Sequence, residues 1–171
     1  MAYIDAPPLA RVQWTIGDPR WLTPLPFASM SEPLPLTPTQ LRCLADWLPI
    51  LEAPGFNAGH WEGGRADEHG VIQMPWFEYD QGLADWPGTC EGETLVVIGF
   101  DWMAWMATAE AQAFARDPHA IARASATDLA RLVTAIRRGD RFTEGNIAGA
   151  FESGVLAAIS RRAGTLLAGD G

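Results

Sequence analysis

Seven prolines within the first 36 residues constrain most strongly what this 171-residue chain can fold into. They are Pro7, Pro8, Pro19, Pro24, Pro26, Pro33 and Pro35. Each proline lacks a backbone amide donor and fixes its own φ, so neither a regular helix nor a central strand can run through this segment. Because the segment also carries large apolar side chains such as Trp14 and Trp21, it is too apolar for a free linker. We predict a proline-rich extended arm over residues 1–36 that lies on the domain or on a partner.

Helix start signals follow the arm. Thr37 suits a helix cap, Pro38 suits the first helical position, and Gln40 completes a capping box three residues after the cap. Ser125 and Asp128 form a second capping box later in the chain. Apolar residues recur at helical spacing after both starts, which predicts amphipathic helices.

Two helix breakers interrupt this pattern. Pro49 is expected to kink or shorten the first helix. The last helix is expected to begin near Thr143 or Glu144, and Gly154 leaves open whether it divides into two helices. We predict a mainly α fold, with residues 37–164 as a single helical domain. It is a compact bundle of four or five helices, followed by a frayed tail at residues 165–171.

Glycines also interrupt the predicted last helix. Gly145 and Gly149 lie four residues apart, and each lowers helix stability by about 1 kcal/mol relative to alanine. The simplest compensation is close approach of another helix backbone at these positions.

A small β-hairpin element is predicted between the first helix and the later ones. Residues 71–79 are rich in strand-forming side chains, but Pro75 restricts them to an edge strand. Residues 95–98 are the expected partner, although a short apolar run fits buried coil or helix equally well. Residues 55–70 are polar and glycine-rich, which predicts a surface loop.

The charge is acidic and unevenly distributed. Twelve basic residues, all arginine, compare with 21 acidic ones and give a net charge of -9. Residues 1–100 carry 13 acidic and 4 basic side chains, whereas residues 101–171 carry 8 of each. Direct nucleic-acid binding is disfavoured, because phosphate contacts need concentrated positive charge. The acidic half either maintains solubility or attracts a basic partner protein.

Cysteine and histidine positions argue against a bound metal. Cys43 and Cys90 are 47 residues apart without metal-ligand spacing, and His60, His69 and His119 form no cluster. Acidic residues lie between His60 and His69, but a solvated loop is the favoured interpretation there. The chain also shows no nucleophile or cofactor motif, so we expect no cofactor.

The lack of a recognisable targeting or membrane-spanning segment favours a cytoplasmic location. No stretch approaches the roughly 20 apolar residues needed to span a bilayer, and no basic segment followed by an apolar run opens the chain. We therefore expect a cytoplasmic protein with reduced thiols and no membrane contact.

The junction between two predicted helices holds the strongest site candidates. They are Arg137, Arg138, Asp140, Arg141 and Glu144. A guanidinium group can grip a carboxylate or phosphate through paired hydrogen bonds, which suggests a ligand site. The favoured structural alternative is that Asp140 or Glu144 pairs with Arg141 and braces the corner, while Glu144 favours the positive end of the last helix. We assign no catalytic residue.

Asp101 and Trp102 are further candidates at the start of another helix. Asp101 suits a helix cap, which we favour, and would act as a functional carboxylate only with an arginine or histidine facing it in a cleft. Trp102 and Trp105 lie at helical spacing and line either a ligand pocket or the core. Eight tryptophans are many for a chain of this size, and an exposed apolar patch would favour partner binding.

Several motifs in the second half resemble one protein family. They are Phe100-Asp101-Trp102 with Trp105, Thr134-Ala135-Ile136-Arg137-Arg138, Asp140-Arg141-Phe142, Glu144-Gly145, and Phe151 with Gly154. Over residues 71 to 162 the chain resembles a bacterial domain-of-unknown-function family, number 6508. The Asp-Arg-Phe-x-Glu-Gly portion is the most specific part. The resemblance implies a compact, mainly helical domain and no particular reaction, and it does not extend to residues 1–70.

Three functional hypotheses follow. The leading one is a non-enzymatic, acidic interaction module that binds a basic partner protein, for example as a phage-encoded inhibitor of a nucleic-acid-binding machine. Its premise is that the arginines serve only architecture, and an open hollow ringed by them would overturn that premise. The alternative is a small enzyme or ligand sensor that holds an anionic metabolite with Asp101, Arg137, Arg141 and Glu144. It predicts a concave pocket into which at least two of these side chains point, unpaired with one another. The third is a homo-oligomer that buries the arm against a second copy.

Overall fold

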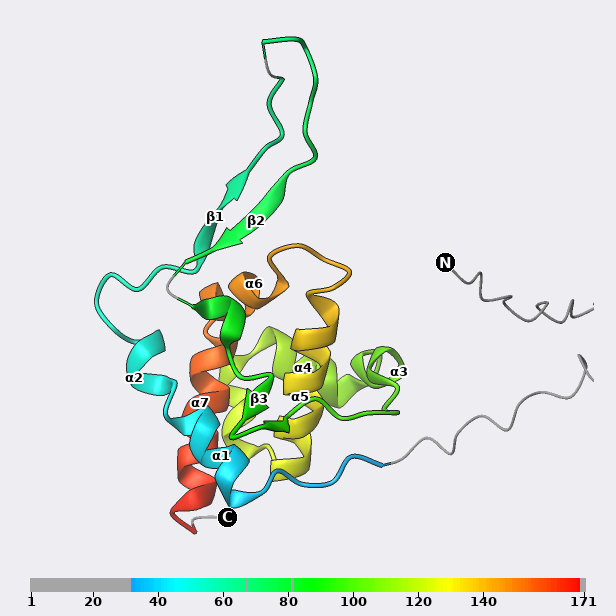
Figure 1. The fold of residues 1–171 in the computed structure, drawn as a ribbon. Helices are drawn as coiled ribbons and strands as arrows, with labels where there is room; N and C mark the ends of the chain where they lie inside the picture. The colour runs from blue at the N-terminus through cyan, green and yellow to red at the C-terminus, as the bar shows by residue number, and fades with distance from the viewer. Residues whose placement is uncertain (1–31, 67, 81, 170–171) are drawn as a thin grey trace, which may run out of the picture.

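The computed structural model describes residues 32–66, 68–80 and 82–169. Most of the predicted arm, residues 1–31, lies outside the described residues. The described part contains seven α-helices (Figure 1). Their bounds are α1 Pro38–Ala45, α2 Leu48–Leu51, α3 Trp102–Met106, α4 Ala109–Arg116, α5 Ala126–Gly139, α6 Asn146–Glu152 and α7 Val155–Leu167. The mainly α fold class is therefore confirmed.

Both predicted capping boxes are present. At α1, the Thr37 hydroxyl accepts a hydrogen bond from the Gln40 amide at 3.3 Å, and the Gln40 side chain accepts one from the Thr37 amide at 2.9 Å. At α5, Ser125 Oγ accepts from the Asp128 amide at 3.1 Å, and Asp128 Oδ2 accepts from the Ser125 amide at 2.9 Å. These reciprocal bonds satisfy amides that a helix start otherwise leaves unpaired.

The helices are more numerous and shorter than expected. Pro49 lies in the first turn of α2, so it starts a new short helix after α1 has ended. Gly154 adopts a φ of 79° and separates α6 from α7, which settles the question left open by the sequence. At the other end, α7 continues to Leu167, into the segment expected to fray at residues 165–171.

Two short antiparallel sheets complete the fold. β1 (Gly59–Glu62) pairs with β2 (Trp76–Tyr79), and β3 (Thr89–Cys90) pairs with β4 (Glu93–Thr94). The hairpin of β1 and β2 projects away from the helical body (Figure 1). The strand β2 was expected, but β1 was not expected as its partner.

The expected partner strand, residues 95–98, lies instead against α5. Leu95 is buried, and the Val97 amide donates to Thr134 Oγ1 of α5 at 2.9 Å. Because the Val97 amide is satisfied by a side chain of α5, it does not need an acceptor on a neighbouring strand. The segment expected as a polar loop, residues 55–70, supplies β1, which is closer in sequence to β2.

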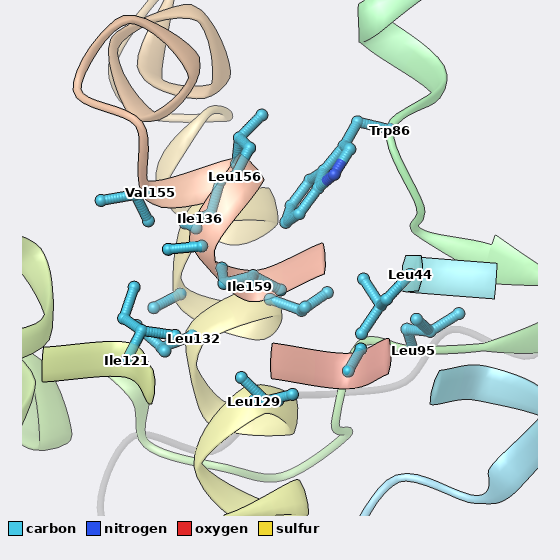
Figure 2. Packing of buried hydrophobic residues seen from close by; sticks show 14 of the residues in the cluster. Leu44, Trp86, Leu95, Ile121, Leu129, Leu132, Ile136, Val155, Leu156 and Ile159 are labelled. Carbon is cyan, nitrogen blue, oxygen red and sulfur yellow. The ribbon is translucent and has the colours of Figure 1, made fainter. Parts of the chain in front are cut away.

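The core lies between α1, α5, α7 and the segment before β3. Figure 2 shows Leu44, Trp86, Leu129, Leu156 and Ile159 meeting there, and all five are fully buried. Burial of a large apolar side chain contributes about 1.5–3 kcal/mol, so Trp86 strongly anchors its own segment. That anchoring holds the turn of β3 and β4 beside the end of α5.

The last residues of the predicted arm contact the start of α5. Leu36 is buried and its amide donates to the Ala126 carbonyl at 3.3 Å, while Glu32 forms an ion pair with Arg131 at 2.8 Å. The division into an arm at residues 1–36 and a domain stays a prediction.

A disulfide joins Cys43 of α1 to Cys90 of β3, with their Cα atoms 6.1 Å apart. The expectation of reduced thiols is therefore wrong. No local pattern predicts this bond, because Cys43 and Cys90 lie 47 residues apart and meet only through the packing of distant segments. No helix within the described ranges is long and apolar enough to cross a membrane.

Candidate functional site

Three arginines near the end of α5 line a surface hollow of about 640 Å³, which we call the arginine hollow. Its lining consists of Arg137, Arg138 and Arg141 together with Gly88, Thr89, Thr94, Val96, Ile98, Trp102 and Phe142. These residues come from α5, from the corner after it, from the start of α3, and from the chain around β3 and β4. Among these lining residues there is no carboxylate, so the hollow carries positive charge.

Arg137 is held by the backbone before β3. Its Nη1 donates to the Ala84 carbonyl at 2.5 Å. The guanidinium also lies close to Gly88, where an added Cβ would come within 3.1 Å of Arg137 Nε. Glycine at this turn therefore permits the close approach. A carbonyl orients the guanidinium but leaves its full charge uncompensated.

Arg138 is held in the same way. Its Nη2 donates to the Val97 carbonyl at 2.9 Å, and its Nη1 donates to the Phe100 carbonyl at 3.4 Å. Neither Arg137 nor Arg138 forms an ion pair with a carboxylate in the described part of the chain. Both lie in the last turn of α5, where positive charge also suits the helix dipole.

Arg141 is exposed, and its side chain makes no hydrogen bond or ion pair with any described residue. The expected brace between Arg141 and Asp140 or Glu144 is therefore wrong. The two carboxylates have other partners, which leaves the Arg141 guanidinium available at the rim of the arginine hollow.

Asp140 and Glu144 anchor the hairpin of β1 and β2. Asp140 Oδ1 accepts hydrogen bonds from the Tyr79 hydroxyl and from the Ile147 amide, the latter at 3.2 Å. Glu144 Oε2 accepts from the Phe77 amide at 3.3 Å. Burial, followed by the hydrogen bond to Asp140, raises the pKa of Tyr79 well above its usual value. These contacts are structural.

Asp101 caps α3, as the favoured interpretation predicted. Its Oδ1 accepts from the Ala104 amide at 2.9 Å, and it lines neither of the hollows described here. Trp102, the next residue, is half-buried and stacks on Phe142, with the ring centroids 6.1 Å apart and the planes 27° from parallel. Phe142 itself is 78% exposed.

A second hollow, of about 620 Å³, shares Trp102 and Phe142 with the first and is mainly apolar. We call it the apolar hollow. Its lining includes Met106, Leu132, Ala135, Ile136, Ala150 and Val155, with Glu144 also present. Because both hollows use the same aromatic pair, they lie next to each other.

The two glycines of this region differ. Gly145 has a φ of 75° and lies against Phe77, to which an added Cβ would come within 3.2 Å. Gly149 lies within α6 and lines the apolar hollow, but an added Cβ there would meet nothing within 4 Å. The expected approach of another helix backbone at Gly149 is therefore wrong.

One histidine cluster was missed by sequence reasoning. The hairpin register pairs His60 with Glu78, and with Glu62 the three ligand atoms lie within 4.8 Å of one another. His60 Nε2 is 2.9 Å from Glu62 Oε1. His60 therefore lies on a strand and not in the expected solvated loop. Alternation places His60 and Glu62 on one face, but only the strand pairing adds Glu78.

Comparisons with known proteins identify the family. A family model described as "Family of unknown function (DUF6508)" matches residues 36–168. The match extends beyond the resemblance at residues 71–162 and includes α1, α2 and the hairpin of β1 and β2. Searches of curated proteins and of solved structures gave no match. Because the model matches most of the chain, this protein belongs to that family of unknown function.

Proposed function

We propose that this protein binds a small anionic ligand in the arginine hollow, as a ligand sensor or a small enzyme. The observation that carries the proposal is that Arg137, Arg138 and Arg141 line one hollow whose described lining contains no carboxylate. This supports the alternative that the sequence left open, with Arg141 as the principal contact.

The electrostatics support an anion. Three guanidinium groups repel one another, and the carbonyls that hold Arg137 and Arg138 do not neutralise them. A phosphate or carboxylate would relieve this repulsion through charge-assisted hydrogen bonds. Arginine suits this role, since its planar fork matches both groups. In a protein with a net charge of -9, such a site concentrates positive charge where a ligand can reach it.

The premise that the arginines serve only architecture does not hold for Arg141. Arg137 and Arg138 fasten the chain around residues 84–100 to α5, so they have a structural role as well. Arg141 has no such contact within the described residues. Removing it should therefore affect binding without affecting folding.

Isothermal titration calorimetry with inorganic phosphate at low ionic strength tests the proposal. A hydrogen bond to a charged group contributes about 1.5–3 kcal/mol, so Arg141→Ala should weaken binding by roughly tenfold to a hundredfold. Raising the salt concentration should also weaken binding.

The matched control is Arg123→Ala, which removes another exposed arginine whose side chain makes no hydrogen bond or ion pair with a described residue and which lies outside both hollows. It should leave affinity within about twofold, and both variants should unfold at the wild-type urea midpoint. Absence of phosphate binding to the wild-type protein, or equal losses in the two variants, would refute the proposal.

The hairpin favours a second candidate, the acidic module that binds a basic partner protein. Trp61, Met74 and Trp76 are exposed on it, with Trp61 at 57% and Met74 at 84%. Glu62 and Glu78 add negative charge on the same hairpin. Exposed aromatic and methionine side chains are typical of a partner-binding surface, and the acidic side chains beside them would favour a partner with a basic surface. Inhibition of a nucleic-acid-binding machine is one form that such binding would take.

A shortened hairpin tests this second candidate. In this chain residues 62–76 are replaced with a two-residue turn, which removes Glu62, Met74 and Trp76, and Trp61 is replaced with serine. Basic proteins retained from lysate by the wild-type chain at low salt, and identified by mass spectrometry, should be lost with the shortened chain. Equal retention by both chains would contradict a role for the hairpin.

Location and assembly stay predictions. A cytoplasmic location is part of the sequence-based hypothesis, whereas the bond between Cys43 and Cys90 favours an oxidising compartment, in which disulfides persist. A homo-oligomer that buries the arm is also still a prediction, and light scattering of the full chain measures it directly.

A further inference from the structure

We propose that the ligand is an amphiphile of the alkyl phosphate class, with its phosphate at the arginine hollow and its hydrocarbon chain in the apolar hollow. This inference rests on the proposed anion site and names the class of ligand. Its basis is the adjacency of a positively charged hollow and an apolar one across Trp102 and Phe142.

The charge pattern orients such a ligand. Three arginines line one hollow, whereas Glu144 lies at the other. An anionic group would be repelled by Glu144 and attracted by the arginines, so the charged end can only lie at the arginine hollow. A phosphate dianion neutralises more of the three positive charges than a single carboxylate does.

The apolar hollow fits a hydrocarbon chain. Its volume of about 620 Å³ lies within the roughly 300–1,000 Å³ typical of ligand pockets. Aliphatic side chains such as Met106, Leu132, Ile136 and Val155 dominate its lining. A chain leaving the arginine hollow would pass the Trp102 and Phe142 rings and cover part of Phe142, which is now 78% exposed.

Gly149 offers a position from which the apolar hollow can be tested. Glycine within a helix lowers the folding equilibrium constant by about fivefold relative to alanine. An added Cβ at Gly149 would meet no described atom within 4 Å, so the fold leaves room for a side chain there. Gly149 also lines the apolar hollow, so a larger side chain at this position would narrow it.

A chain-length series tests the inference. Calorimetry would measure the affinity of the full-length protein for inorganic phosphate and for ethyl, butyl, hexyl and octyl monophosphate, each below its critical micelle concentration. Each methylene buried should increase affinity by about fourfold until the apolar hollow is filled.

Two variants test where the hydrocarbon chain of the ligand binds. Gly149→Leu places a side chain in the apolar hollow and should remove most of the dependence on chain length while leaving the affinity for inorganic phosphate unchanged. Ala113→Leu adds the same side chain at an exposed helical position outside the hollow and should keep the full dependence. Urea midpoints of both variants confirm that each is folded.

The outcomes separate this inference from the proposed function. If inorganic phosphate binds but affinity stays flat along the series, the amphiphile is excluded and the anion site stands. If the affinity of Gly149→Leu still rises with the length of the alkyl group, the hydrocarbon binds elsewhere and the inference is overturned. If inorganic phosphate does not bind, the proposed function itself fails, and the inference that rests on it fails with it.

Discussion

Breaking the bond between Cys43 and Cys90 should lower the free energy of unfolding by about 4 kcal/mol, since the bond closes a loop across 47 residues. This value follows from the chain-entropy relation for a loop of that length at 25 °C. The effect acts mainly on the unfolded chain, because Leu41 and Leu44 bury α1 in the core independently of the bond. The reduced protein should therefore still fold.

Urea unfolding followed by tryptophan fluorescence measures the effect. The oxidised protein, the reduced protein and the Cys43→Ser/Cys90→Ser variant would be compared. The last two should share a lower midpoint, a native-like spectrum before unfolding, and a larger m value, since the open chain exposes more surface. Equal midpoints for oxidised and reduced protein would refute this reasoning. Two titratable thiols in folded protein prepared without reductant would also refute it.

Three further predictions concern the framework of the site. Thr134→Val should lower the free energy of unfolding by about 1–3 kcal/mol in urea, because the Val97 amide loses its acceptor; an unchanged midpoint would contradict this. Gly145→Ala should destabilise the protein by about 1–2 kcal/mol because φ is positive there. Gly149→Ala should stabilise it by about 1 kcal/mol, because a Cβ fits inside α6 at this position. Shifts of the same sign in the thermal melts of the two variants would contradict these different roles of the two glycines. The raised pKa of Tyr79 favours its protonated form in the folded state, so its contribution to stability should persist below about pH 10 and decline above it. Tyr79→Phe should flatten that decline in urea unfolding between pH 8 and 11.5, and parallel curves would exclude Tyr79 as its source.

The sequence predicted the parts of the fold that depend on neighbouring residues. Both capping boxes need only residues three apart, and Pro49 was expected to kink or shorten the first helix because of its own backbone preference, whereas the break at Gly154 was left open. The partner of β2 and the bond between Cys43 and Cys90 depend on contacts between distant segments. No pattern within one segment contains that information, so these two features were missed or predicted wrongly.

The candidate site shows the same limit. The three arginines were chosen as site candidates from the sequence, and the structure places all of them at one hollow, while a ligand there stays a proposal. The partners of the neighbouring carboxylates were predicted wrongly, because spacing along the chain suggested that Arg141 would pair with Asp140 or Glu144. The turn after α5 instead directs both carboxylates to the hairpin. The other wall of the arginine hollow, around residues 88–98, lies too far away in sequence for its position to be foreseen.

The corner at residues 140–145 has two sides with different duties. Asp140 and Glu144 fasten the root of the hairpin, while Arg141 and Phe142 border the hollows. Occupation of a hollow that shifts this corner would thus also tilt the projecting hairpin. Thermodynamic linkage then requires the reverse: whatever grips the hairpin would change affinity at the arginines by the same factor. In that event ligand binding at the arginines and partner binding at the hairpin would be coupled through the corner at residues 140–145.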